Sequence, residues 1–225
     1  MTHDGAGSHV ASAPERYLPA MGRDWLLPLY DPLTRALGIK AAHRLLVDQA
    51  DLRSGQRVLE IGCGTGNLAL LIKLLHPEVD VVGLDPDPRA LAQAQRKARR
   101  RGLGVHLDRG FSQRLSYPDA SFDRVLSAFM FHHLEPTGRR STLREVGRVL
   151  RPGGTLHLLD FGGARDSSDG LLARFAHHNT RLQDSFGDRI PELMRDGGLA
   201  DPAETGHRVT VAGRYTLWSA RRPES

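Results

Sequence analysis

The stretch Arg57–Leu68, which reads Arg-Val-Leu-Glu-Ile-Gly-Cys-Gly-Thr-Gly-Asn-Leu, decides the fold. It begins with a short, partly β-branched apolar run, which is typical of a buried parallel strand. Glycines then follow at every second position, Gly62, Gly64 and Gly66, and apolar residues at helical spacing come after them. The glycines therefore occupy the turn from a strand into a helix, where they permit positive φ and let a ligand approach the backbone. The helix start adds free N–H groups and the positive end of its dipole.

Two acidic residues stand at fixed distances from this turn. Glu60 precedes the first glycine by two residues, and Asp85 follows Gly66 by 19 residues, at the end of a second apolar run. The second spacing is close to the ~20 residues that bring a carboxylate to the tip of the next strand in nucleotide-binding folds. At that tip a carboxylate can accept hydrogen bonds from both ribose hydroxyls. Asp85 can also begin a turn before Pro86, and the two roles are compatible.

The same strand, turn and helix could bind a dinucleotide, but that fingerprint requires Gly-x-x-Gly where this chain has Gly64–Asn67. The pattern present, Glu-x-Gly-x-Gly-x-Gly, resembles motif I of the class I S-adenosylmethionine-dependent methyltransferases. The resemblance covers Arg57–Gly162 and includes Phe122–Leu134 as the fourth-strand motif and Leu150–Gly154 as the loop before strand five. By eye it is nearest to the quinone-biosynthesis C-methyltransferases and their small-molecule relatives.

This resemblance implies that S-adenosyl-L-methionine is the cofactor. The residues expected to contact it are Glu60, Gly62, Cys63, Gly64, Gly66, Asp85, Pro86, Phe111, Ser112 and Ser127. One departure concerns the adenine, because relatives carry Gly-Asp-Ala after strand three and this chain has Gly110-Phe111-Ser112. Phe111 could stack on the adenine or meet its edge, and Ser112 could offer a hydrogen bond. The usual adenine carboxylate is therefore missing.

Two histidines follow the fourth strand. Methyl transfer from a sulfonium is an in-line displacement, and positioning and desolvation of the nucleophile can supply most of its acceleration. An acceptor with an acidic proton also needs a base, which histidine can provide near neutral pH. We expect His133 to be this base, with His132 and Glu135 as alternates, although the pair could instead fix the loop beneath the cofactor. A second pair, His177-His178, has neither the orientation nor the neighbours of a metal site, so no metal is expected.

Composition restricts the class of protein. The 225 residues, 40% hydrophobic and 25% charged, predict one soluble domain. A single cysteine, Cys63, excludes an intramolecular disulfide framework and favours a cytoplasmic location. The polar segment Met1–Ala20 and the lack of a ~20-residue apolar run predict neither a signal peptide nor a membrane span. The net charge of +5 comes mainly from arginines, densest over Arg96–Arg101, which we interpret as a solvated helix face rather than a nucleic-acid site.

Strands that alternate with helices predict an α/β fold with a doubly wound, Rossmann-like, mostly parallel seven-stranded sheet. An antiparallel C-terminal hairpin, Arg208–Val211 with Tyr215–Ala220, is expected to close its edge. Helices are predicted at Pro88–Arg101, Gly138–Leu150, Gly170–Leu182 and Ile190–Asp196. Residues 1–13 are expected to be a disordered tail and residues 14–225 a single methyltransferase domain. That domain comprises an N-terminal helical cover (14–50), the cofactor-binding core (51–162) and a C-terminal part (163–225).

The methyl acceptor is expected to be chosen by the N-terminal cover and by Phe161–Gln183. Tyr17, Trp25 and Tyr30 are candidates to lie over the acceptor pocket, or they pack a peripheral helix onto the core. The sequence thus predicts methyl transfer to a small-molecule N, O or C nucleophile by a monomer or homodimer. A methyltransferase acting on RNA or protein and a noncatalytic S-adenosylmethionine-binding module are the alternatives. An enzyme that methylates exocyclic base amines is excluded, because Ser127–Met130 lacks the Pro-Pro-Tyr/Phe of that group.

Overall fold

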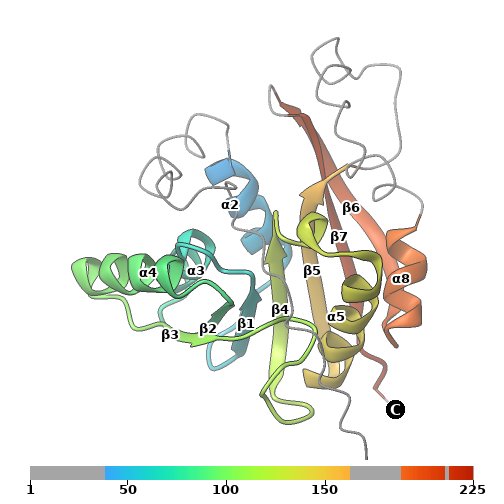
Figure 1. Cartoon of the computed structure of the whole chain (residues 1–225), viewed down its shortest axis with the longest axis horizontal. Coiled ribbons are helices and arrows are strands. Elements are labelled where there is room, and N and C mark those ends of the chain that lie inside the picture. Colours follow the sequence, from blue (N-terminus) through green and yellow to red (C-terminus); the bar gives the residue numbers. More distant parts are fainter. Residues whose placement is uncertain (1–38, 163–188, 211–212, 225) are drawn as a thin grey trace, which may run out of the picture.

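The computed structural model describes residues 39–162, 189–210 and 213–224 (Figure 1). Within them one seven-stranded sheet has the order β3-β2-β1-β4-β5-β7-β6. The strands are β1 (Arg57–Ile61), β2 (Asp80–Asp85), β3 (His106–Arg109), β4 (Phe122–Ala128), β5 (Leu150–Phe161), β6 (Ala200–Thr210) and β7 (Gly213–Arg221). The helices are α2 (Ile39–Gln49), α3 (Asn67–Leu75), α4 (Pro88–Arg101), the short 3₁₀ helix η2 (Phe131–His133), α5 (Pro136–Val149) and α8 (Ile190–Asp196).

The five strands from β3 to β5 run parallel, and β7 and β6 complete the sheet in the antiparallel sense. The predicted fold class is therefore confirmed. The predicted tail 1–13 and the helix Gly170–Leu182 lie outside the described residues, as does the cover up to residue 38. The proposed domain division stays a prediction. None of the described helices is long and apolar enough to cross a membrane.

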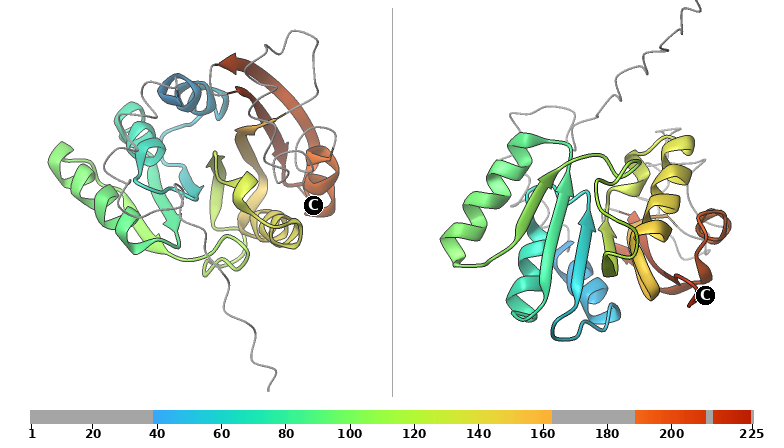
Figure 2. Two further views of the ribbon diagram at one scale, coloured as in Figure 1. Left: turned by 45° about the horizontal axis from the view of Figure 1, so that its top comes forward. Right: turned by 90° about the horizontal axis from the view of Figure 1, so that it is seen from below.

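Helices cover both faces of the sheet (Figure 2). Successive strand residues point to opposite faces, so Val58 of β1 packs with the buried side of α2 and α3, whereas Leu59 joins the cluster under α5 and α8. α4 packs over β2 and β3 through three buried alanines one helical turn apart. The crossovers place α3 and α4 on one side and α5 on the other. This leaves the carboxyl ends of the parallel strands open at one rim.

Two strands differ from the sequence prediction. β5 begins at Leu150, because the chain passes from α5 directly into the sheet and Phe122 pairs with Leu150 before a register shift. The predicted loop Arg151–Gly154 is thus an irregular first part of the strand. β6 covers 11 residues, whereas only its last three and Val211 were predicted. This edge strand has mostly exposed side chains, a proline and two register shifts, so it lacks the apolar alternation by which strands are recognised.

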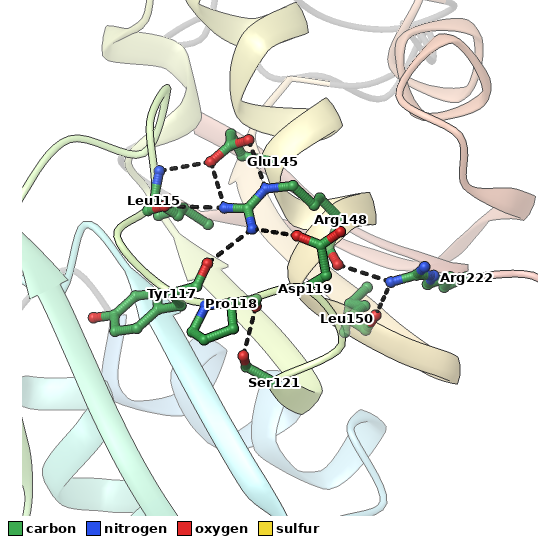
Figure 3. Close-up of polar contacts among 9 residues, drawn as sticks. All are labelled: Leu115, Tyr117, Pro118, Asp119, Ser121, Glu145, Arg148, Leu150 and Arg222. Atoms are coloured by element: carbon green, nitrogen blue, oxygen red, sulfur yellow. Dashed lines mark hydrogen bonds and ion pairs between the residues drawn. The ribbon is translucent and has the colours of Figure 1, made fainter.

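Arg148 on α5 fixes the loop between β3 and β4 (Figure 3). Its Nε and Nη2 donate to the two oxygens of Glu145, over 2.9 and 2.8 Å. Nη2 also donates to the carbonyl of Leu115 (2.9 Å), while Nη1 donates to the carbonyl of Tyr117 (2.8 Å) and to Asp119 (2.7 Å). All five N–H groups of the guanidinium are therefore used, which no other side chain could reproduce.

Replacing Arg148 with Met should lower the free energy of unfolding by about 2 kcal/mol or more, because Glu145 and two backbone carbonyls lose their charged donor. Urea denaturation monitored by circular dichroism measures this. Arg144→Met on the exposed side of the same helix is the matched control and should change stability by about 0.5 kcal/mol or less. Equal midpoints for the two variants would show that the Arg148 contacts do not hold the loop.

Candidate functional site

The glycine turn has the backbone that the sequence predicts. The φ angles of Gly62, Gly64 and Gly66 are 73°, 50° and 76°, all in the left-handed region that favours glycine. The N–H groups of Gly62 and Cys63 donate to the carbonyl of Leu84 at the end of β2, over 2.8 and 3.0 Å. The turn is thereby held against the neighbouring strand, and α3 starts immediately after it.

Asp85 ties the tip of β2 to this turn. One carboxylate oxygen accepts from the N–H of Gly64 (2.8 Å), and the other accepts from the N–H of Asp87 (2.9 Å). Burial raises the pKa of Asp85, and the two backbone hydrogen bonds act in the opposite direction. A carboxylate has about four acceptor positions, so each oxygen can accept one more hydrogen bond.

Glu60 lies at the base of the turn with 3% of its surface exposed. Burial raises the pKa of Glu60 to about 8, although the N–H of Ala69 and the charge of Lys97 act to lower it. Its Oε2 has no hydrogen-bond partner among the described residues. A buried oxygen in this state indicates a place for a donor from outside the chain.

Lys97 of α4 braces the other side of the turn. Its ammonium donates to Oγ1 of Thr65 (3.0 Å) and to Oδ1 of Asn67 (2.7 Å). A Cβ on Gly66 would lie 2.8 Å from Cβ of Ala94 in the same helix, so α4 can approach this closely only because residue 66 is glycine. The turn is thus held by β2 and α4 together.

Gly62 and Gly64 differ in how much free space surrounds them. A Cβ on Gly62 would lie 2.2 Å from Cγ of Met130, so that side chain covers Gly62. A Cβ on Gly64 would meet no atom of the described residues within 4 Å. Beside the carboxylate of Asp85 the turn is therefore open, and it can receive a ligand there.

Phe129 turns the chain from β4 toward Met130 with a φ of 54°, an uncommon conformation for an aromatic residue. Its N–H donates to the carbonyl of Leu159 (2.8 Å), and its ring packs against Phe161, with 4.8 Å between ring centroids, and against Tyr215, with 6.0 Å. The fold therefore stabilises a strained turn, and such strain is often found at functional sites.

His132 and Asp160 form a close pair at the rim. Nδ1 of His132 lies 2.6 Å from Oδ1 of Asp160, and the backbone N–H of His132 donates to Oδ2 over 2.9 Å. Asp160 is 2% exposed and also accepts from the N–H of Phe161 (2.7 Å). Because a carboxylate only accepts, Nδ1 of His132 carries the hydrogen of this contact.

His133, the first choice from sequence, stands beside this pair and not in it. Its ring centroid is 3.9 Å from that of His132. Desolvation, followed by the charge that His132 can carry, lowers the pKa of His133 to about 4, although part of the ring reaches the surface. Glu135, the other alternate, is exposed and precedes α5.

The remaining predicted cofactor residues have distinct surroundings. Ser112 is buried, and its hydroxyl is 2.9 Å from that of Thr142 on α5, so this side chain is already engaged. Ser127 is fully buried at the end of β4, and its hydroxyl has no partner in the described part of the chain. Burial raises the pKa of the Cys63 thiol well above its usual range, so this group is not a reactive thiolate. Phe111 is half-buried just beyond β3. The carbonyl of Pro86 accepts a hydrogen bond from Nε of Arg109 (3.3 Å).

No role was predicted from sequence for Asp160 or Tyr215. The pairing of Asp160 with His132 joins residues 28 positions apart, for which no local signal exists. The predicted acceptor residues Tyr17, Trp25 and Tyr30 lie outside the described residues, as does the His177-His178 pair. In the described ranges no three His, Cys, Asp or Glu side chains are grouped to hold a metal ion.

A family model described as "Methyltransferase domain" matches residues 58–154. A demethylmenaquinone methyltransferase of Deinococcus radiodurans is 39% identical over 139 residues, which are 60% of this chain and 57% of that protein. The demethylmenaquinone methyltransferase of Thermus thermophilus is 39% identical over 152 residues, 66% of this chain and 68% of that protein. This chain belongs to the S-adenosylmethionine-dependent methyltransferases. The quinone-biosynthesis enzymes are among its relatives, as the motifs predicted.

The fold agrees with this assignment. The structure of phosphoethanolamine N-methyltransferase 2 of Haemonchus contortus in complex with S-adenosyl-L-methionine superposes with a TM-score of 0.74 over 91% of this chain and 58% of that one, at 16% identity. The cofactor of the family is S-adenosylmethionine. The open side of Gly64 next to Asp85 and the unpartnered oxygen of Glu60 fit a ligand with hydroxyl and ammonium donors.

Two alanine substitutions distinguish the glycine that leaves space for a ligand from the glycine that is packed against the protein. Gly64→Ala should leave the protein folded, with about 1–2 kcal/mol of left-handed strain, but should weaken binding of S-adenosylhomocysteine at least tenfold, because its methyl group enters the open side of the turn. Gly62→Ala should lower the melting temperature more, since its methyl group collides with Met130. Calorimetric titration and thermal melting measure the two effects. Unchanged affinity in Gly64→Ala would place the ligand elsewhere.

Proposed function

We propose that this protein transfers a methyl group from S-adenosylmethionine to a small-molecule N, O or C nucleophile. The observation that carries the proposal is the position of the His132–Asp160 pair on the same rim as the glycine turn. Met130 connects the two, because it covers Gly62 and directly precedes the helix that contains His132. A site for the cofactor and a site for proton removal are thereby adjacent.

The cofactor would be held by the turn and the strand tips around it. We assign the ribose hydroxyls to Asp85 and the amino group of the methionine part to the side of Glu60. Phe111 and the backbone near Ser112 would face the adenine, with Cys63, Pro86 and Ser127 lining the same side. When bound, S-adenosylmethionine supplies the methyl group as an electrophile.

We assign the role of base to His132 rather than His133. Asp160 holds Nδ1–H of His132, so Nε2 is oriented to accept a proton and the resulting imidazolium faces a carboxylate. His133, with a pKa of about 4, is a weaker base at neutral pH, and a general base works best when its pKa is near the working pH. His133 would instead fix the ring of His132 from the side.

The rim favours a flat, apolar acceptor. Phe161 lies 5.4 Å from the ring of His132 and 4.8 Å from that of Phe129, and Tyr215 packs on the same group. Aromatic rings bind planar apolar molecules by stacked or edge contacts. Together with the names of the relatives, this supports a quinone-type ring as the acceptor. Tyr17, Trp25 and Tyr30 would complete the pocket as part of a single domain over residues 14–225.

His132→Gln should lower the turnover number about a hundredfold and leave the affinity for S-adenosylhomocysteine unchanged, because only the base is lost. The assay follows methyl transfer to a reduced short-chain naphthoquinone. Asp160→Asn should also lower the turnover number, since the carboxylate that orients the ring of His132 is lost. Exposed His106 on β3 provides the control, and His106→Gln should retain full activity. Full turnover in His132→Gln would remove this residue as the base, and no turnover in wild type despite tight cofactor binding would favour the noncatalytic module.

A further inference from the structure

The positive charge of the protein is concentrated in one segment. Residues 86–116 hold eight of the 31 lysines and arginines but only two of the 26 acids, a formal charge of +6. The whole chain carries +5, so the other 194 residues together carry −1. The 14 residues of α4 include six basic residues and no acid. The net charge is therefore a local feature and not a general property of the surface.

This segment forms one side of the molecule. β3 is an edge strand of the sheet and α4 packs on it, at the end opposite β6 and α8 (Figure 1). The exposed basic side chains define what we call the α4–β3 face: Arg89, Arg96, Arg99, Arg100, Arg101 and Arg109. Arg109 pairs in register with Asp85, so the face reaches the rim that carries the site.

The arginines at the end of α4 are exposed and have no partner in the described part of the chain, as is also true of Arg140 and Arg144 on α5 and of Arg189 and Arg195 at α8. Among the described residues, Arg96, Arg99, Arg100 and Arg101 form no ion pair and no side-chain hydrogen bond. In contrast, seven arginines outside this face pair with carboxylates: Arg44, Arg53, Arg57, Arg148, Arg151, Arg214 and Arg221. Arg96, Arg99, Arg100 and Arg101 are thus available to an anion from outside the chain.

Helix stability accounts for only part of this pattern. Cations in the last turn are favoured by the helix dipole, which concerns Arg99, Arg100 and Arg101. The dipole does not explain Arg96 or the absence of acids along the whole exposed side, where glutamate four residues before an arginine would stabilise the helix. The pattern instead suits a surface that carries many phosphates, because the planar guanidinium binds phosphate oxygens in pairs.

We propose that the α4–β3 face binds the anionic phosphate headgroups of a membrane surface. A cluster of about four to eight cations on a helix is typical of attachment to anionic lipid. Neither α4 nor β3 contains a Phe, Tyr or Trp on which the bases of a single-stranded nucleic acid could stack. The choice of a membrane rests on the proposed function, since a quinone-type acceptor with an apolar tail resides in lipid. Attachment would hold the rim close to that acceptor.

Sedimentation of the full-length chain with vesicles tests this proposal without any acceptor. The protein should bind vesicles of phosphatidylcholine with phosphatidylglycerol, but not phosphatidylcholine alone, and high salt should release it. The variant R96Q/R99Q/R100Q/R101Q should bind at least about tenfold more weakly. The control R140Q/R144Q/R189Q/R195Q removes the same charge from exposed positions on and beside α5 and α8, and should bind like wild type. Thermal melting with S-adenosylhomocysteine checks that both variants retain the fold and the cofactor site.

Equal weakening in the two variants, or no binding to anionic vesicles, would overturn the proposal. So would tighter binding of duplex DNA or RNA than of vesicles at the same salt concentration, if it depended on the same four arginines. Vesicle binding that is lost only in the α4 variant, in a protein that shows no methyl transfer, would support the surface and contradict the proposed function. The experiment therefore distinguishes a failure of membrane binding from a failure of the proposed methyl transfer.

Discussion

The site depends first on the hydrogen bond from the N–H of Gly64 to the carboxylate of Asp85. Glycine allows the left-handed backbone at residue 64, and the carboxylate of Asp85 on the neighbouring strand holds this backbone in place. Met130 packs on the turn so formed, at Gly62. The helix that follows then brings His132 to Asp160. A single line of contacts therefore connects the glycine turn with the His132–Asp160 pair.

The basic residues differ in the number of hydrogen bonds that their side chains donate. Arg148 meets five acceptors at once, which only a planar guanidinium can do, and it holds the loop that leads from Phe111 to β4. Lys73 donates to two backbone carbonyls beyond the C-terminal end of α3, and Lys97 donates to two side-chain oxygens at its N-terminal end. Arg96, Arg99, Arg100 and Arg101 of α4 meet none among the described residues. These four arginines lie at the β3 edge of the sheet, where we propose that they bind an anion from outside the chain.

The sequence predicts those parts of the fold that have a local signature. Apolar runs, glycine spacing and proline at the helix start indicate β1, β2, the turn and the full extent of α4. The pair of His132 with Asp160 could not be predicted, since it depends on the register between β4 and β5. The positive φ of Phe129 is likewise imposed by tertiary packing, and the edge strand β6 has no apolar face to recognise. Local sequence therefore predicts the glycine turn, whereas long-range strand pairing determines the His132–Asp160 pair.

Thermal melting in the presence of either S-adenosylhomocysteine or NAD shows which ligand the glycine turn binds. Each ligand is added at about 100 times a micromolar dissociation constant. We expect S-adenosylhomocysteine to stabilise the protein by about 2.7 kcal/mol, seen as a rise of several degrees in melting temperature, and NAD to cause no change. Asp85→Asn should reduce this rise, because the ribose would lose its charged acceptor. A rise with NAD, or none with S-adenosylhomocysteine, would contradict the assignment of the glycine turn.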